Sequence, residues 1–263
     1  MSSEAWQVRL FEKSLMKKEK VGLIREKVDF AGRRIVDLGC AQGTVSYQLK
    51  KNGGEWIHAD TDLANLRSSR PLLEENLVRI EPERLPFRDR CCDVVLALDF
   101  LEHVENDGQV VREAHRILGE SGRIVVSTPI SGPSFLLNRI KRRIGLNPEI
   151  FGHKREGYSL EQLNSMLEKN GFRVETSLTY AKFFVELFET ALNYLYVRKN
   201  RKTAPALRTG AISPSSASDI ERNRRLFGLY AWVVYPVVYL ISRLDRILFF
   251  KTGYATLVIG RKK

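Results

Sequence analysis

The stretch that decides the fold covers residues 33–62 and reads "RRIVDLGCAQGTVSYQLKKNGGEWIHADTD". It contains two apolar runs, and an aspartate closes each of them, Asp37 the first and Asp60 the second. A glycine turn with Gly39 and Gly43, followed by a stretch of helical periodicity, separates the two runs. A strand, a helix and a second strand in this order form a right-handed crossover unit with parallel strands. The stretch therefore predicts an α/β fold.

The alternation of strand and helix patterns continues along the chain. Apolar runs such as "CDVVLALD" and "RIVVSTP" are separated by helical stretches, among them "GQVVREAHRILGESG" at 108–122. A later helix opens with Ser159 as N-cap and Gln162 as its capping-box partner, and it closes at Gly171 before another strand. The segment "GYATLVIGRKK" at 253–263 is one more strand pattern. Together these patterns predict a parallel sheet that is covered by helices on both faces.

Composition and charge narrow the class of protein. A chain of 263 residues is long enough for one main domain and a smaller appendage. Its 43 Lys and Arg against 31 Asp and Glu give a formal charge of +12, which favours anionic partners such as acidic lipid or nucleic acid. Cys40, Cys91 and Cys92 form no CxxC pair, which is typical of a reducing compartment. Residues 1–28 lack the apolar core of a secretory signal and predict an amphipathic helix, so we expect a cytoplasmic protein.

The glycine turn and the two aspartates indicate a ligand. Ligands of open parallel sheets bind at the carboxyl ends of the strands, and glycines let the first turn come close to them. Asp60 lies 21 residues after Gly39, where a carboxylate accepts hydrogen bonds from a ribose diol. The dinucleotide fingerprint GxGxxG is not met, and Asp37 would repel a pyrophosphate but can hold an ammonium group. A nucleoside that carries an amino acid satisfies both acids, and S-adenosylmethionine is such a molecule.

Several motifs in order resemble one known family. These are "VDLGCAQG", "HADTD", "LPFRDRCCDVVLALDFLEHV", "EAHRILGESGRIVVSTP" and "GHKREGYSLEQLNSMLEKNGF". Over about residues 33–176 the chain resembles the class I S-adenosylmethionine-dependent methyltransferases, of the broad family that includes ubiquinone-type enzymes. The resemblance implies a Rossmann-like, seven-stranded, mostly parallel sheet with helices on both faces.

The same resemblance implies a set of cofactor-binding residues. The methionine part would meet the first turn and the ribose hydroxyls would meet the second acid; the residues are Asp37, Gly39, Cys40, Gly43 and Asp60. Glu81 lies where the family has an acid that accepts from the adenine amino group, and Asp99 closes the fourth strand. The next position is Pro82, which has no N–H to donate to adenine, so either Glu83 replaces it or stacking holds the ring.

The segment "DFLEHVEND" supplies candidates for catalysis. Methyl transfer to a hydroxyl needs alignment with the methyl group and a base that removes the proton. His103 is the preferred base, although the Glu102–His103 pair is equally consistent with holding a loop or capping a helix. The pair is also consistent with a divalent metal, but the sequence does not favour that interpretation and predicts no metal. His153 is the second catalytic candidate, and the alternative is a hydrogen bond that orders its loop.

Residues 180–251 depart from a soluble methyltransferase and predict an apolar helical insertion. We expect core at 1–179, the insertion with a polar linker at 203–219, and the final strand of the core at 252–263. The run at 226–241 is uncharged and is flanked by arginines, but it is short for a membrane span and contains Pro236. It therefore predicts a helix at the membrane interface, the alternatives being packing on the domain, packing on a second copy, or a full span.

The position of the insertion suggests the substrate. A parallel sixth strand would end near Tyr180 on the cofactor side of the sheet, so the insertion would start at the mouth of the active site. Arg139, Lys141, Arg142 and Arg143 would lie over the same opening, either to bind a phosphate or as a solvated face. This favours a peripheral membrane enzyme that methylates, at oxygen, a lipid or lipid-linked acceptor such as a quinone precursor or polyprenyl-linked glycan.

Other functions remain open. The first is a methyltransferase for a soluble small molecule whose C-terminal helices form a homodimer. The second is a non-catalytic adaptor that brings a partner to the membrane. A nucleic-acid methyltransferase is not expected, because the fourth strand lacks the Asn/Asp-Pro-Pro-aromatic tetrad and the basic residues flank apolar helices.

Overall fold

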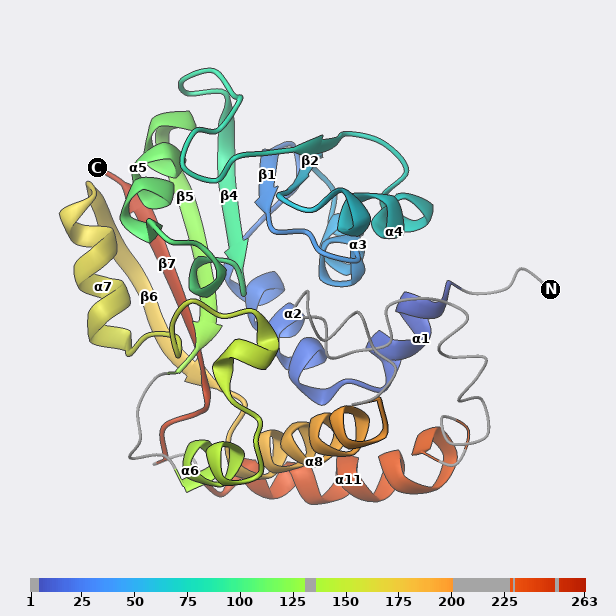
Figure 1. Cartoon of the computed structure of the whole chain (residues 1–263). Helices are drawn as coiled ribbons and strands as arrows, with labels where there is room; N and C mark the ends of the chain where they lie inside the picture. Colours follow the sequence, from blue (N-terminus) through green and yellow to red (C-terminus); the bar gives the residue numbers. More distant parts are fainter. Residues whose placement is uncertain (1–4, 131–135, 201–227, 229, 249–250) are drawn as a thin grey trace.

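The computed structural model describes residues 5–130, 136–200, 228, 230–248 and 251–263. One sheet of seven strands forms its centre, in the order β3-β2-β1-β4-β5-β7-β6, with only β7 antiparallel to its neighbours (Figure 1). This confirms the predicted Rossmann-like sheet. The strands are β1 (Arg34–Leu38), β2 (Glu55–Asp60), β3 (Leu77–Arg79), β4 (Cys92–Leu98), β5 (Leu118–Pro129), β6 (Phe172–Tyr180) and β7 (Ala255–Lys262).

Helices cover both faces of the sheet, and three further helices lie beyond the carboxyl ends of its strands. The helices of the core are α1 (Trp6–Glu12), α2 (Leu15–Lys27), α3 (Thr44–Lys50), α4 (Leu63–Leu73), α5 (Asp107–Ile117) and α7 (Leu160–Lys169). Helix α6 (Leu136–Arg143) and the insertion helices α8 (Phe183–Asn200) and α11 (Tyr235–Ser242) lie together beyond these ends (Figure 1). Short 3₁₀ turns are η1 (Leu101–His103), η2 (Pro148–Phe151) and η5 (Arg243–Arg246), and η4 (Tyr230–Val234) is a π-helical turn.

The central strands are apolar on both sides because both sides are packed. Along β4, Val95 and Ala97 join the cluster formed with α5 and α7, whereas Val94 and Leu96 join the cluster formed with α2. Successive side chains of a strand point to opposite faces, so a strand between two helical layers has no polar face. This is the reason why its sequence shows a continuous apolar run.

Local signals at helix ends were predicted well, with two exceptions. Ser159 and Gln162 form the capping box of α7. The single N-terminal helix is wrong, because Ser14 caps a second helix by accepting from the Lys17 N–H and so divides α1 from α2. The helix expected to reach residue 122 ends at Ile117, where the chain turns directly into a bulged start of β5.

The insertion leaves and rejoins the sheet at one point. Strands β5 and β6 both run antiparallel to β7 and therefore parallel to each other, which confirms that β6 ends on the side where β1 and β4 end. Tyr254 returns to this point, where its N–H donates to the Ala181 carbonyl at 2.9 Å. The insertion therefore begins beside the carboxyl ends of the parallel strands.

A long-range cap joins the two ends of the insertion. Asp245 in η5 is buried, and its carboxylate accepts from the N–H groups of Phe184 and Val185 at 2.9 Å each. These are orphan donors in the first turn of α8. The cap thus holds the start of α8 against the returning segment.

Two predictions about the insertion concern its polar linker and a possible membrane span. The linker at 203–219 lies outside the described residues. Of the helices in the described ranges, none combines the length and the apolar character that a membrane crossing needs.

Candidate active site at the carboxyl ends of the strands

The first turn needs glycine at two positions. Gly39 has φ +79°, and a Cβ there would lie 2.5 Å from the Phe100 ring. Gly43 has φ +77°, and a Cβ there would lie 3.0 Å from the Leu73 and Ser69 side chains. Any residue with a Cβ would be strained in this backbone conformation and would lack space. The turn therefore presents bare backbone just before α3.

Asp60 lies beside this turn at the end of β2. One carboxylate oxygen, Oδ2, accepts from the Ala41 N–H at 2.9 Å, and Oδ1 accepts from the Asp62 N–H and the Asn65 amide. A carboxylate offers about four acceptor positions, so one position on Oδ2 remains. Burial raises the pKa of this carboxyl group. The geometry fits a residue that is held rigidly and still accepts one bond from a ligand hydroxyl.

Asp37 is more enclosed than its predicted role requires. It is 3% exposed, and its Oδ2 atom accepts from the Ser46 hydroxyl and lies 3.2 Å from His58 Nδ1. Only Oδ1 is left for an ammonium group, so contact with the methionine part stays a prediction. Cys40 is buried next to the turn, and burial raises the pKa of its thiol.

Asp99 pairs with a lysine that the sequence analysis did not single out. Asp99 follows β4 with φ +51°, and its carboxylate contacts the buried Lys20 ammonium of α2. Burial alone would lower the pKa of Lys20, but the charge of Asp99, the hydrogen bond to it and the nearby Tyr180 and Glu102 together outweigh burial, and the pKa is raised. The contact spans 79 residues of sequence. Nothing in a lysine-rich helix distinguishes Lys20 from its neighbours beforehand.

Glu81 is exposed just after β3. Its backbone forms an isolated bridge with Arg84, and the preceding Ile80 N–H donates to the Asp60 carbonyl. Glu81 thus lies next to the end of β2, on the side of Asp60. A contact with adenine, there or at the exposed Glu83, stays a prediction.

A cavity of about 250 Å³ opens between the strand ends and the helices beyond them. Asp99, at the end of β4, is one of its lining residues, and α6 and α8 form its outer wall. Two ion pairs line it, Lys141 with Glu186 and Arg142 with Glu156. The basic segment over the opening was predicted to be either a phosphate site or a solvated face. Neither description is complete, since two of its cations form ion pairs with acidic residues of the protein.

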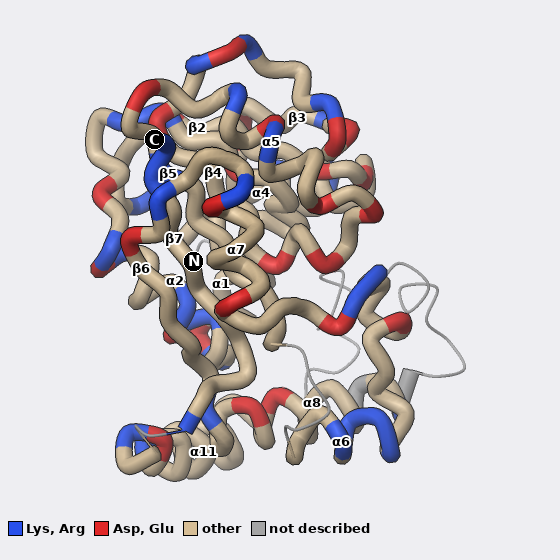
Figure 2. The backbone as a smooth tube through the Cα atoms, turned by 90° about the vertical axis from the view of Figure 1, so that its left-hand side faces the viewer, with Lys and Arg blue, Asp and Glu red and all other residues tan. Residues whose placement is uncertain are grey.

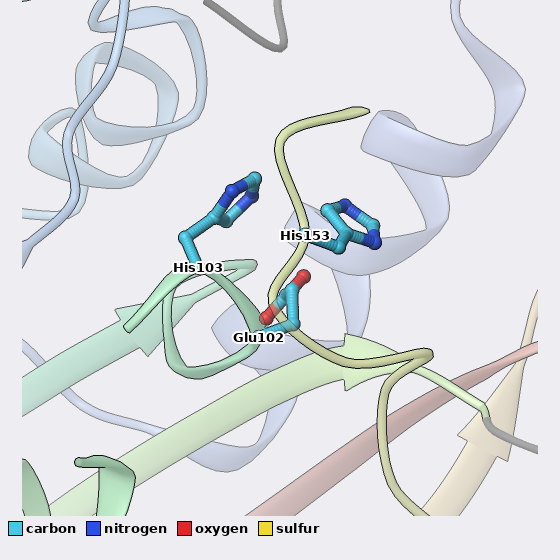
Figure 3. Close-up of side chains that lie close together, drawn as sticks. All are labelled: Glu102, His103 and His153. Atoms are coloured by element: carbon cyan, nitrogen blue, oxygen red, sulfur yellow. The ribbon is translucent and has the colours of Figure 1, made fainter. Parts of the chain in front are cut away.

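Three side chains from two distant segments lie close together (Figure 3), and two of them, Glu102 and His153, line this cavity. Donor atoms of Glu102, His103 and His153 lie within 4.8 Å of one another. The two imidazole rings are 4.7 Å apart between centroids, edge to face. Both histidines named as catalytic candidates are thus neighbours, although the sequence places them 50 residues apart.

Burial controls the protonation of this cluster. It lowers the pKa of His103, and it lowers the pKa of His153 to about 4 with a contribution from the neighbouring His103. Burial also raises the pKa of Glu102 well above its usual value. His103 Nδ1 lies 3.2 Å from the Gly152 carbonyl, which accepts, so Nδ1 carries the proton and holds the loop before His153. The loop-ordering alternative for His103 therefore has a visible contact.

Comparison with known proteins gives this arrangement a family context. Residues 36–126 match a methyltransferase domain. This methyltransferase domain covers β1 to most of β5 and includes the glycine turn, Asp60 and the Glu102–His103 pair.

The curated relatives align over part of their length. The chain is 27% identical over 124 residues to a ubiquinone biosynthesis O-methyltransferase of Pseudomonas aeruginosa, covering 45% of this chain and 53% of that protein. An enzyme of the same name from Azorhizobium caulinodans is 32% identical over 102 residues, covering 37% and 40%. The chain thus spans about half the length of the curated relatives it matches.

Solved structures support the fold. An S-adenosylmethionine-dependent methyltransferase of Archaeoglobus fulgidus superposes with a TM-score of 0.56 and 20% identity over 94% of both chains. The cyclase SpnF superposes with a TM-score of 0.58 and 14% identity, over 93% of this chain and 80% of that one. The chain therefore has a methyltransferase fold, and the activity must be argued from the site.

Proposed function

We propose that the protein is an S-adenosylmethionine-dependent methyltransferase that methylates, at oxygen, a lipid or lipid-linked acceptor at a membrane surface. The observation that carries the proposal is the cavity at the carboxyl ends of the strands, because α8, the first helix of the insertion, forms part of its outer wall. The relatives named as ubiquinone biosynthesis O-methyltransferases agree with an acceptor of quinone-precursor type. A polyprenyl-linked glycan would present the same combination of hydroxyl and lipid tail.

The residues of the turn fit the cofactor. When bound, S-adenosylmethionine supplies an electrophilic methyl group on a sulfonium. The remaining acceptor position of Asp60 would take a ribose hydroxyl, and the bare backbone at Gly39 would let the amino-acid part approach. Asp99, at the end of β4, lines the cavity and carries a paired charge. The chain thus separates a donor side from an acceptor side.

The acceptor hydroxyl must lose its proton during transfer. His153 lines the cavity, and with a pKa of about 4 it is neutral near pH 7 with a free lone pair. His103 donates Nδ1–H to the loop, whereas it is His153 that lines the cavity, so we assign His103 the positioning role and His153 the role of base. Alignment by the cavity would supply the larger part of the acceleration.

The membrane part of the proposal rests on where apolar side chains are exposed. With the exception of Leu63, every large exposed hydrophobic residue in the described ranges lies in or beside α6, α8 or residues 230–247. Trp232 is 84% exposed and Leu240 is 66% exposed. We call this set the apolar layer; it consists of Leu136, Ile140, Ile144, Leu195, Trp232, Val233, Val234, Val237, Tyr239, Leu240, Leu244 and Ile247.

Basic residues accompany the apolar layer. Figure 2 shows lysines and arginines along α6 and near the end of α11. Exposed aromatic and aliphatic side chains beside arginines are typical of helices that lie in the headgroup region of anionic membranes. An acceptor with a lipid tail would then reach the cavity from the membrane without crossing water.

Sedimentation with vesicles tests the proposal. The double variant Trp232→Glu/Leu240→Glu should bind vesicles of anionic phospholipid at least about tenfold more weakly than the wild type, because two apolar contacts become charged. Leu63→Glu, an exposed leucine outside the apolar layer, is the matched control and should bind like the wild type. Both variants should bind S-adenosylmethionine equally well in calorimetry.

The outcomes distinguish the alternatives. A wild-type protein that binds the cofactor, stays off vesicles and forms a dimer that the double variant abolishes would favour the soluble enzyme with a helical dimer interface. A protein that binds vesicles but no cofactor would favour the adaptor. Methyl transfer from labelled cofactor into a lipid extract, lost in His153→Ala, is the result expected of the proposed enzyme.

A further inference from the structure

One buried acidic side chain, that of Glu102, has no partner for its carboxyl group among the described residues. Glu102 is 0% exposed, and neither of its carboxylate oxygens has a hydrogen-bond partner among the described residues. A buried carboxylate without a partner is strongly unfavourable, so such groups are normally satisfied. Lys20 is close enough to influence Glu102, but its ammonium donates to Asp99.

From this cluster we infer a binding site for a divalent first-row transition-metal ion, ligated by Glu102, His103 and His153. The three side chains offer donor atoms within 4.8 Å of one another. Donors around a tetrahedral ion with bonds of about 2.1 Å are roughly 3.4 Å apart, so rotations of the side chains are sufficient to close the site. The sequence predicted no metal because only the adjacent Glu102–His103 pair is apparent in it; the loop that carries His153 supplies the third ligand.

The contacts that the two histidines make with the rest of the protein favour metal binding. His103 donates Nδ1–H to the Gly152 carbonyl at 3.2 Å, which leaves the Nε2 lone pair free. A metal-bound histidine commonly donates its other ring N–H to a carbonyl in this way, and the contact fixes the tautomer and ring orientation. The ring of His153 is held edge to face against His103 and near Phe151.

The local charge balance is also compatible with a cation. The cations that face the cavity are paired, Lys141 with Glu186 and Arg142 with Glu156. Lys20 is likewise paired, with Asp99. The Glu102 carboxyl group has no such cationic partner among the described side chains, and a bound metal ion would supply one.

The ligand set indicates the class of ion. Two imidazoles and one carboxylate suit Zn²⁺, Co²⁺, Fe²⁺ or Mn²⁺, whereas Mg²⁺ and Ca²⁺ prefer sites made of oxygen. Three protein ligands leave at least one coordination position open, and Glu102 and His153 face the cavity. An acceptor hydroxyl at that position would lose its proton more readily, and the ion would then take over from His153 as the group that activates the hydroxyl, because a coordinated imidazole has no lone pair left to accept a proton. This last step rests on the proposed function, whereas metal binding does not.

Calorimetric titration tests the site directly. The protein, freed of purification tags and stripped with chelator, is titrated with Zn²⁺, and visible absorption of Co²⁺ reports the coordination. We expect one ion per chain, with binding weakened at least about tenfold in Glu102→Gln and in His153→Ala. His115→Ala removes a histidine of α5 that lies outside the cluster, and it should leave binding unchanged.

Two outcomes would overturn the inference. One is a wild-type protein that takes up neither Zn²⁺ nor Co²⁺; the other is wild-type affinity in both Glu102→Gln and His153→Ala. Thermal unfolding without metal checks that the variants fold, and if Glu102→Gln fails that check, the partly exposed His153 decides alone. Cofactor binding in the same samples separates failure of this site from failure of the proposed methyltransferase.

Discussion

At the scale of single residues, Asp60 is the best-defined part of the donor side. Three protein donors fix its carboxylate, and one acceptor position remains beside the bare backbone of Gly39. A group held in this way loses little conformational freedom when a ligand binds. The affinity for the cofactor should therefore depend strongly on this one side chain.

Asp60→Asn should weaken binding of S-adenosylmethionine by about 10- to 100-fold, because a hydrogen bond to a charged acceptor contributes about 1.5–3 kcal/mol. The amide also places a donor against one of the three protein donors. Calorimetry with the wild type and with Asp62→Asn, the neighbouring aspartate that caps α4, gives the comparison. Equal affinity in Asp60→Asn and wild type would contradict the ribose role.

The pH dependence of cofactor binding follows from the same residue. Burial raises the pKa of Asp60, and the ionised form is the better acceptor. Affinity should be complete above the raised pKa and should fall as the pH decreases through it, at a higher pH than the value of about 3.9 of an ordinary aspartate. Calorimetry over a descending pH series should show this fall in the wild type and its absence in Asp60→Asn.

At the scale of elements, the cap of α8 shows how distant segments stabilise one another. A helix is usually capped by the residue just before it, as α4 is by Asp62, but α8 takes its cap from Asp245, about 60 residues later. The acid is buried and accepts two backbone N–H groups at the positive end of a helix dipole. The fold of the returning segment and the start of α8 therefore depend on each other.

Asp245→Ala should lower the free energy of unfolding by about 1–2 kcal/mol, since it removes a helix cap and leaves two donors unsatisfied. Urea denaturation followed by circular dichroism measures the loss. Arg246→Ala, at an exposed position of the same turn, should change it by less than about 0.5 kcal/mol. Equal effects of the two substitutions would mean that the cap contributes nothing specific.

The same scale shows what could be predicted from the sequence. The parallel sheet, the glycine turn and the Ser159–Gln162 capping box come from patterns a few residues long, so they were readable in advance. The Lys20–Asp99 pair and the Asp245 cap join segments whose approach depends on tertiary packing, and their residue types have no local signal. His153 was named as a candidate, but its meeting with Glu102 was not foreseen, because it depends on the path of a loop.

At the scale of the whole molecule, the insertion helices α8 and α11 lie beyond the carboxyl ends of the strands (Figure 1), and the cavity is lined by residues from both the strand ends and α8. Helix α8 lies between the sheet and the outermost α11 (Figure 1), and it is α8, not α11, that contributes residues to the lining of the cavity. The residues that we assign to the cofactor site are therefore all different from those that we assign to the membrane site.

Binding to anionic vesicles should weaken as salt is added, because charges near the membrane are screened over a Debye length of about 10 Å at 0.1 M ionic strength. Arg139→Ala/Arg143→Ala, which changes two exposed arginines of α6, should lower that binding by roughly fivefold per residue. Sedimentation with neutral vesicles is the control and should hardly respond to the substitutions. Equal losses on both kinds of vesicle would contradict an electrostatic role.

The point where the insertion leaves and returns has one more consequence. Tyr254 bonds back to Ala181, and Gly253 lies so close to Tyr180 that a Cβ would be 2.0 Å from its carbonyl oxygen. A short hairpin would therefore be enough to join the antiparallel neighbours β6 and β7 at this point of the sheet. Another segment with the same two end points would change which acceptors enter and from where, while the register of the sheet and the donor side stay as they are.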